Sequence, residues 1–269
     1  MKNKLGICLS GGFNEELTLE QNISAIADAG FEATFFGWDE KNDNCERARL
    51  CEKYGIEIDN FHAPFAGFNC VWLEGSAGDE YTERIMNCAR EAGTLGIKHI
   101  IVHPTAGAPE PVGSVIGLER FKRIIDTATN CGVKVCFENL EYPEILGLVM
   151  EEFKNENIGF CFDTGHESIC TPGMRFIPLY GDKLCCTHIH DNYGASYTKV
   201  PIIHGDCHML PLDGAIDFER VMRDIRSVDY KGVLMIEASV RADLGTYYGF
   251  SAKQYYERAY TALKKLSEM

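Results

Sequence analysis

Short apolar runs alternate with longer amphipathic segments along the whole chain. Eight of the runs are rich in β-branched and aromatic residues, which is the pattern of buried strands. The predicted strands are LGICLS from Leu5, FEATFF from Phe31, IEIDNFH from Ile56, HIIVH from His99, VKVCFE from Val133, IGFCFD from Ile158, CCTHIH from Cys185 and GVLMIE from Gly232.

The amphipathic segments between these runs predict helices. Several of them leave through a glycine, which is typical of a helix end that turns back into a strand. Residues 142–153 carry a weaker helical pattern, and residues 165–181 are interrupted by Pro172, Gly173 and Pro178, which predicts a short or irregular helix. The clear helical segments are 18–29, 46–54, 81–95, 117–130, 218–226 and 252–266.

Eight β–α units in series predict a parallel sheet, and eight is the number that closes a barrel. We therefore expect an α/β fold, a (β/α)8 TIM barrel, formed as a single domain by residues 1–269. No linker or low-complexity tract divides the chain. The alternative is an open, doubly wound sheet, but the first strand is followed by Ser10-Gly11-Gly12 and not by a G-x-G-x-x-G turn.

The charge balance and the cysteines narrow the setting of the protein. The 269 residues include 26 basic and 40 acidic side chains, a net charge of −14 that disfavours nucleic acid as a partner. No apolar stretch approaches the roughly 20 residues of a membrane span, and the N-terminus reads as a first strand and not as a secretion signal. We expect a cytoplasmic protein whose twelve cysteines are reduced, those in strands being small core residues: Cys136, Cys161, Cys185 and Cys186.

Side chains that bind metals recur where the predicted strands end. Parallel strands in a barrel all point their carboxyl ends to one face, so these residues would meet around one mouth despite their distance in sequence. A single strand-end histidine is more often structural, but repetition at successive strands favours a divalent-metal site for Zn²⁺, Mn²⁺, Fe²⁺ or Co²⁺. The candidate ligands are His62, His103, Glu138, Asp163, His166, His190 and Glu237, with Asp206 and His208 in the loop between the last two strands.

Other polar residues have alternative interpretations. His188 lies one layer below His190 and is expected in the core or behind the ligands, and His99 begins its strand and is expected at the opposite end of the barrel. Trp38 follows the second strand, where it would either stack on a sugar ring or pack in the loop. Arg241, four residues past Glu237, would either meet a phosphate or carboxylate of a substrate or remain a solvated charge.

The stretches HAPF, VHPT, FENL, FDTGH, HIHDN and DCHMLPLDGAIDF resemble the xylose-isomerase-like TIM-barrel superfamily over nearly the whole chain. This group includes sugar and sugar-phosphate isomerases and epimerases, inosose dehydratases and type IV apurinic endonucleases. The resemblance to its ketose epimerases implies one metal held by Glu138, Asp163, His190 and Glu237. It also implies that Glu138 and Glu237 are the catalytic acid/base pair and that His166 contacts a substrate oxygen.

The resemblance to the endonucleases implies three zinc ions instead. Their ligands would be His62, His103 and Glu138 for one ion, the four epimerase-type residues for the second, and His166, Asp206 and His208 for the third. The net charge, the absence of clustered basic residues in the mouth loops and the MLPLDGAIDF pattern all disfavour that activity.

The sequence therefore predicts an enzyme: a divalent-metal-dependent isomerase or epimerase with one to three Zn²⁺ or Mn²⁺ ions. Its partner would be a small sugar or sugar phosphate, with no membrane, and association with further copies of the chain stays open. The alternatives are a zinc-dependent phosphodiesterase of the apurinic-endonuclease kind and a non-catalytic sugar-binding barrel.

Overall fold

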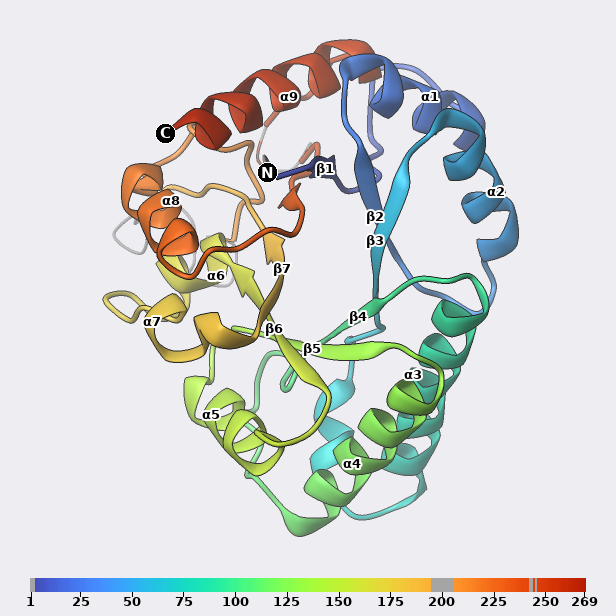
Figure 1. The fold of residues 1–269 in the computed structure, drawn as a ribbon, viewed down its shortest axis with the longest axis vertical. Helices are drawn as coiled ribbons and strands as arrows, with labels where there is room; N and C mark the ends of the chain where they lie inside the picture. The colour runs from blue at the N-terminus through green and yellow to red at the C-terminus, as the bar shows by residue number, and fades with distance from the viewer. Residues whose placement is uncertain (1–2, 195–205, 242–243, 245) are drawn as a thin grey trace.

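The computed structural model describes residues 3–194, 206–241, 244 and 246–269. Eight strands form one sheet in which every paired neighbour is parallel, in the order β7-β6-β5-β4-β3-β2-β1-β8 (Figure 1). The strands are β1 (Leu5–Ile7), β2 (Ala33–Gly37), β3 (Glu57–His62), β4 (His99–Val102), β5 (Lys134–Glu138), β6 (Ile158–Asp163), β7 (Leu184–His188) and β8 (Leu234–Ile236).

The two outer strands of this order, β7 and β8, meet just beyond the end of β7. Ile189 pairs in parallel with Ile236, its amide donates to the Met235 carbonyl at 2.7 Å, and its own carbonyl accepts from the Glu237 amide at 3.1 Å. These bonds close the sheet on itself. The structure confirms the prediction of a single-domain (β/α)8 TIM barrel over an open sheet.

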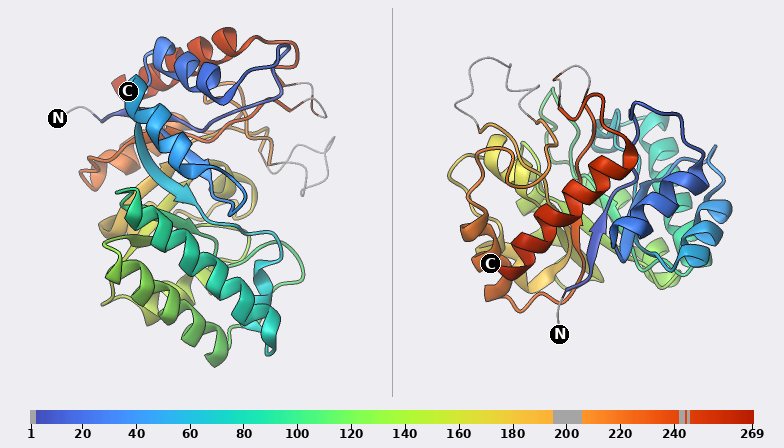
Figure 2. Two further views of the ribbon diagram at one scale, coloured as in Figure 1. Left: turned by 90° about the vertical axis from the view of Figure 1, so that its right-hand side faces the viewer. Right: turned by 90° about the horizontal axis from the view of Figure 1, so that it is seen from above.

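The helices surround the strands as a ring, and both chain termini lie on the same side of the molecule (Figures 1 and 2). Within the described residues, no helix is both long enough and apolar enough to cross a membrane. The helices are α1 (Leu19–Ala29), α2 (Asn44–Tyr54), α3 (Ser76–Thr94), α4 (Val115–Asn130), α5 (Pro143–Glu152), α6 (Thr164–Ile169), α7 (Ile177–Tyr180), α8 (Phe218–Ser227) and α9 (Ala252–Glu268), with the 3₁₀ turns η1 (Phe68–Trp72) and η2 (Gly181–Lys183).

The helical segments predicted from the sequence are confirmed, and all of their ends except the start of α3 lie within two residues of the prediction. Thr18 caps α1 in a full capping box with Gln21, and the interrupted stretch 165–181 is the short α6 followed by α7. Two features escaped the hydrophobic pattern. These are η1 and the first turn of α3, whose residues SAGDE show no apolar periodicity.

Strand β7 is shorter than predicted. We expected the strand to run to His190, but it ends at His188, because Ile189 pairs with β8 and Asp191 pairs with Met209 in an antiparallel bridge. His190 is nonetheless fully buried. After His188 the backbone leaves the sheet at the seam where β7 and β8 meet, but the His190 side chain still faces the mouth.

The main core lies between the sheet and the helices, where Phe61, Phe121 and Phe137 are completely buried. The barrel interior holds a separate cluster of Ile101, Cys136, Cys161 and Cys186, against which Cys185 packs. The prediction of buried thiols is confirmed for Cys136, Cys161 and Cys186, whereas Cys185 is partly exposed. Small side chains leave room inside a barrel of this size.

One buried cation holds η1 to the start of α3. The Arg120 side chain on α4 is only 2% exposed and donates to the carbonyls of Val71 at 3.0 Å and Gly75 at 2.9 Å. It also contacts the Asp79 carboxylate at 3.1 Å, and a Cβ atom on Gly78 would lie 2.2 Å from its Nη1. These long-range hydrogen bonds stabilise η1 and the start of α3, although the local sequence carries no helical pattern there.

We predict that Arg120→Met destabilises the fold by about 3–5 kcal/mol, because the substitution leaves several buried carbonyls without a donor. The midpoint of denaturant unfolding measures the effect. Arg123→Met is the matched control, since Arg123 contacts Asp79 at 3.5 Å from an exposed position and should cost less than about 1 kcal/mol. Equal stability of the two variants would contradict this account.

Candidate metal centre

The carboxyl ends of the strands gather a buried set of acidic and imidazole side chains. Glu138 ends β5 and Asp163 ends β6, and neither is exposed to solvent. The structure brings all nine predicted ligands to this mouth of the barrel, where their side chains contact one another. The set comprises His62, His103, Glu138, Asp163, His166, His190, Asp206, His208 and Glu237.

The first cluster in this set joins β3, β4 and β5. The Nε2 atoms of His62 and His103 lie 3.4 and 3.2 Å from Oε2 of Glu138, and the two imidazole rings stand 4.8 Å apart at a steep angle. One donor atom from each residue lies within 4.8 Å of the others. Two nitrogens and one oxygen thus face a common point.

The second cluster is built on α6 and on the loop before α8. His166 Nε2 lies 3.4 Å from Asp206 Oδ2, and His208 Nε2 lies 3.0 Å from the same oxygen. The His190 ring stacks on the His208 ring with centroids 4.1 Å apart. These four residues again place one donor atom each within 4.8 Å of one another.

Asp163 and Glu237 lie between the two clusters. His190 Nε2 is 3.0 Å from both oxygens of Asp163, and His166 Nδ1 is 3.4 Å from Asp163 and from Glu138. Glu237 follows β8 and keeps 18% of its side chain exposed. Of the four carboxylates in the set, Glu237 and the 29% exposed Asp206 reach solvent, whereas Glu138 and Asp163 are fully buried.

His188 lies where the sequence predicted it, buried and behind the candidate ligands. Its Nδ1 lies 3.2 Å from Glu138 Oε1 and 3.1 Å from Glu237 Oε2. Its ring is fully buried and stacks on Phe35 with centroids 4.8 Å apart. One nitrogen therefore contacts both glutamates, a relation that the shared parity of His188 and His190 on their strand could have suggested.

Backbone carbonyls fix the orientation of three imidazoles. Nδ1 of His62 faces the Ala63 carbonyl at 2.9 Å, Nδ1 of His208 faces the Glu237 carbonyl at 2.9 Å, and Nδ1 of His166 faces the Asn139 carbonyl at 3.1 Å. A carbonyl only accepts, so each Nδ1 carries the proton and each Nε2 presents a lone pair when the ring is neutral. Such support is characteristic of metal-binding histidines.

Neighbouring carboxylates and imidazoles at the mouth shift one another's pKa values. Burial opposes the charge of Glu237, but His188 beside it lowers the pKa of the carboxyl to about 2. Burial likewise opposes the charge of His208, but Asp206 raises the pKa of that imidazole to about 9. The pKa of His103 is lowered because burial dominates there. Buried carboxylates here are compensated by neighbouring imidazolium groups.

Several buried donor atoms fit a divalent cation better than they fit one another. His103 Nε2, Glu138 Oε2 and Asp206 Oδ1 are enclosed and make no hydrogen bond of normal geometry within the described residues. Unsatisfied buried polar atoms are costly, and a cation at their centre would satisfy them. The donor set of imidazoles and carboxylates suits Zn²⁺ or Mn²⁺.

Residues next to the ligands in the chain hold them in place. The Asn139 side chain accepts from the Asp163 amide and donates to the Asp163 carbonyl, both at 2.8 Å. Thr164 Oγ1 donates to the His190 carbonyl at 2.7 Å, and a Cβ atom on Gly165 would lie 1.9 Å from the His190 ring. The FENL and FDTGH stretches therefore carry both ligands and the groups that position them.

Asp191 performs the same task for the loop that supplies Asp206 and His208. Its carboxylate accepts from the amides of Gly214 at 2.8 Å and Ile216 at 3.1 Å. A Cβ atom on Gly214 would lie 2.4 Å from Asp191 Oδ1. The HIHDN and DGAIDF stretches thus form one contact, although 23 residues separate Asp191 from Gly214.

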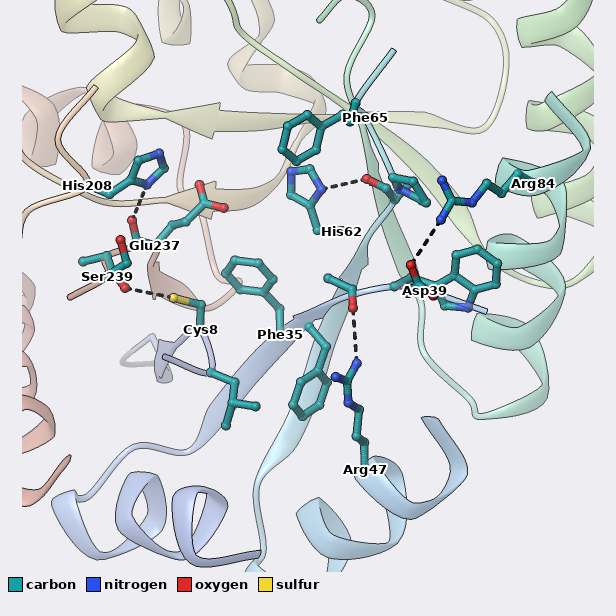
Figure 3. Close-up of a pocket in the computed structure, with 18 residues that line it drawn as sticks. Cys8, Phe35, Asp39, Arg47, His62, Phe65, Arg84, His208, Glu237 and Ser239 are labelled. Carbon is teal, nitrogen blue, oxygen red and sulfur yellow. Dashed lines mark hydrogen bonds and ion pairs between the residues drawn. The ribbon is translucent and has the colours of Figure 1, made fainter. Parts of the chain in front are cut away.

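A cavity of about 600 Å³ opens beside the metal-binding residues (Figure 3). His62, His208 and Glu237 lie on one side of it, and aromatic rings, Arg47 and Arg84 complete the wall. Trp38 lines the cavity but is 5% exposed, and its Nε1 donates to Glu91 at 2.6 Å. Arg241 lies beside the ligand loop, 3.5 Å from the Asp206 carbonyl, and is not among the residues that line the cavity.

We predict that Gly165→Ala weakens metal binding by roughly 10- to 100-fold, since the methyl group displaces the His190 ring. Metal titration by calorimetry measures the change. Gly147→Ala is the matched control, because its Cβ would meet only the Tyr180 hydroxyl at 3.6 Å. Unchanged affinity in Gly165→Ala would show that His190 does not hold the ion.

Metal uptake should also depend on pH in a defined direction. His208 has a pKa raised to about 9, so it is protonated at neutral pH and must lose its proton to bind a cation. We expect proton release on binding and an affinity that rises with pH up to about 9. Calorimetry in buffers of different ionisation enthalpy counts the protons, and metal uptake without proton release would contradict the assignment of His208.

Among the curated proteins that match the chain in sequence, two illustrate the range. An uncharacterized protein, y4fM, of Sinorhizobium fredii is 30% identical over 149 residues, which cover 55% of this chain and 43% of that protein. An inosose dehydratase of Histophilus somni is 23% identical over 274 aligned positions, covering 87% of this chain and 89% of that enzyme. The chain therefore spans less than half of the first relative and most of the second.

Among the solved structures that share the fold over almost their full length are two that bear on the site. The IOLI protein with a bound zinc atom superimposes with a TM-score of 0.76 at 16% identity, over 98% of each chain. A D-allulose 3-epimerase from Methylomonas sp. in complex with D-allulose gives a TM-score of 0.75 at 15% identity, over 98% of this chain and 97% of that one. The family model for xylose isomerase-like TIM barrels matches residues 23–266, and the chain belongs to this family.

Proposed function

We propose that this protein is a divalent-metal-dependent isomerase or epimerase of a sugar, sugar phosphate or cyclitol. The observation that carries the proposal is the pair of glutamates on either side of His188. Glu138 and Glu237 come from strands at different positions of the barrel, and Nδ1 of His188 contacts both within 3.2 Å. A substrate beside these side chains would have a carboxylate on each of two sides.

The chemistry follows from the state of these two groups. Neighbouring histidines lower the pKa of both carboxyls, in spite of burial, so both are ionised at neutral pH. A bound divalent cation supplies Lewis-acid polarisation of a carbonyl, which makes the adjacent C–H acidic. One glutamate then removes that proton and becomes a carboxylic acid, which can return the proton to the neighbouring carbon. For return to the opposite face, the other glutamate first takes up a proton from His188, whose pKa is raised and whose Nδ1 contacts both carboxylates, and the first glutamate then restores the His188 proton.

Other residues of the mouth would orient the substrate. Glu237, His62 and His208 face the cavity, and Asp163 and His190 complete the four-residue set proposed for the metal. Phe35 and Phe65 offer apolar surfaces to the C–H face of a sugar ring. In this proposal His166 contacts a substrate oxygen, Trp38 forms part of the wall, and Arg241 acts from the rim.

The size of the cavity and the relatives support a small polyhydroxylated substrate. A volume of about 600 Å³ lies within the range of small-molecule sites. A D-allulose 3-epimerase and an inosose dehydratase are among the similar proteins, and the similar IOLI protein holds zinc.

The test is solvent exchange. Incubation of the Mn²⁺- or Zn²⁺-loaded protein with a panel of keto-sugars and cyclitols in D₂O should place deuterium on a carbon next to the carbonyl of at least one compound. Glu138→Gln and Glu237→Gln should each reduce exchange by at least about 100-fold, the scale of general acid–base catalysis. Mass spectrometry of the recovered sugars measures the incorporation.

Glu219→Gln is the matched control, since Glu219 is an exposed carboxylate in the first turn of α8. Absence of exchange across the panel would count against the isomerase. Sugar binding that persists in Glu237→Gln, without exchange by the unmodified protein, would instead support a non-catalytic sugar-binding barrel.

A second function, metal-dependent phosphodiester hydrolysis, is favoured by one observation. The residues that flank the glutamates form two separate donor clusters, one around His62 and His103 and one around Asp206 and His208. Elemental analysis of the purified protein distinguishes the two functions. Three ions per chain with cleavage of an abasic duplex would establish the phosphodiesterase, and one ion with an intact duplex would exclude it.

A further inference from the structure

A second group of possible metal donors lies inside the barrel, away from the mouth. Asp59 on β3, His99 at the start of β4 and Cys186 on β7 each place one donor atom within 4.8 Å of the other two. In the sheet order β7 is separated from β4 by β5 and β6. These side chains can therefore meet only across the interior of the barrel, near its axis.

The group lies toward the amino-terminal end of the strands, which we call the floor. His99 is the first residue of β4, and Cys186 precedes the mouth residue His188 by two positions on the same face of β7. Tyr230 closes the floor beneath, where its hydroxyl donates to the carbonyls of Cys185 at 3.1 Å and Val233 at 3.0 Å.

Asp59 is the residue that requires explanation. Asp59 is only 8% exposed, and one of its carboxylate oxygens accepts a hydrogen bond from the side-chain amide of Asn60 at 2.9 Å. No ion pair with a Lys, Arg or His nitrogen within 4.0 Å is found for it in the part of the chain that is described. A buried carboxylate without a cation is expensive unless it is protonated or binds a metal.

The two neighbouring donor residues, His99 and Cys186, favour a bound metal over a protonated Asp59 carboxyl. Imidazole, carboxylate and thiolate together form a donor set for Zn²⁺, whose bonds of about 2.0–2.3 Å in a tetrahedron separate the donor atoms by about 3.3–3.8 Å. The present separations reach at most 4.8 Å, so small side-chain rotations would close them. His99 is partly exposed, which gives an ion a route from the floor.

We propose that Asp59, His99 and Cys186 form a thiolate-containing divalent-cation site, with Zn²⁺ as its ligand, at the floor of the barrel. The site would tie β3, β4 and β7 together across the interior. It lies below the mouth, because Cys186 precedes His188 by two positions on β7 and His99 begins β4, four positions before His103. Its function is structural and does not depend on the proposed reaction.

Cobalt substitution tests the proposal directly. The full-length protein, stripped with a chelator and reloaded with Co²⁺, should show a thiolate-to-cobalt charge-transfer band in the near ultraviolet. The nine mouth ligands are imidazoles and carboxylates and produce no such band. We expect the band to disappear in Cys186→Ser and to persist in Glu237→Gln. In His99→Gln and Asp59→Asn, we expect the apparent Co²⁺ affinity, measured from the band during titration, to fall at least tenfold.

Cys161→Ser is the matched control, because Cys161 is a buried barrel thiol next to Cys186 whose donor atom also lies near Glu138 and His188. Retention of the band in Cys161→Ser and its loss in Cys186→Ser would support the floor site. Absence of the band in the unmodified protein, its survival in Cys186→Ser, or its loss only in Cys161→Ser would overturn the proposal. If Cys186→Ser does not fold, His99→Gln at the partly exposed floor gives the decisive comparison.

Discussion

The structure depends on how the barrel accommodates two carboxylates, Glu138 and Asp163, that have no contact with solvent. Isolated charges at such depth would be prohibitive, and here each is surrounded by imidazoles within 3.0–3.4 Å. The parallel barrel makes this possible, since it directs every strand end to one mouth. The same surroundings hold the pKa of Glu138 well below its usual range and leave donor atoms directed at common points, two properties that suit the proposed metal-dependent proton transfer.

Several residues that are not candidate ligands hold the charged side chains in position. Asn139 ties β5 to Asp163, Thr164 ties the start of α6 to His190, and Asp191 anchors the loop that carries His208. Gly165 is required because any side chain there would enter the His190 ring. The FENL, FDTGH, HIHDN and DGAIDF stretches are thus parts of one hydrogen-bonded frame that holds the candidate ligands.

The barrel could be predicted, and so could the gathering of the candidate ligands at its mouth, because both follow from simple periodicities. Strand ends are visible in the hydrophobic pattern, and a chemical group at each end needs only the direction of parallel strands to be placed. His188 was expected in the core or behind the ligands and lies there, but its simultaneous contact with both glutamates could not be predicted, because it depends on the closing seam at Ile189, where β7 and β8 meet. Likewise η1 and the first turn of α3 are held by Arg120 from a distant helix, and no local pattern reports that contact.

The central claim is that the mouth of the barrel holds a divalent cation between the two glutamates. The most direct measurement is an anomalous difference map from crystals of the protein loaded with Mn²⁺. The account predicts a peak within about 2.0–2.3 Å of donor atoms of Glu138, Asp163, His190 and Glu237. A fully loaded crystal with no anomalous peak among these four side chains would contradict it.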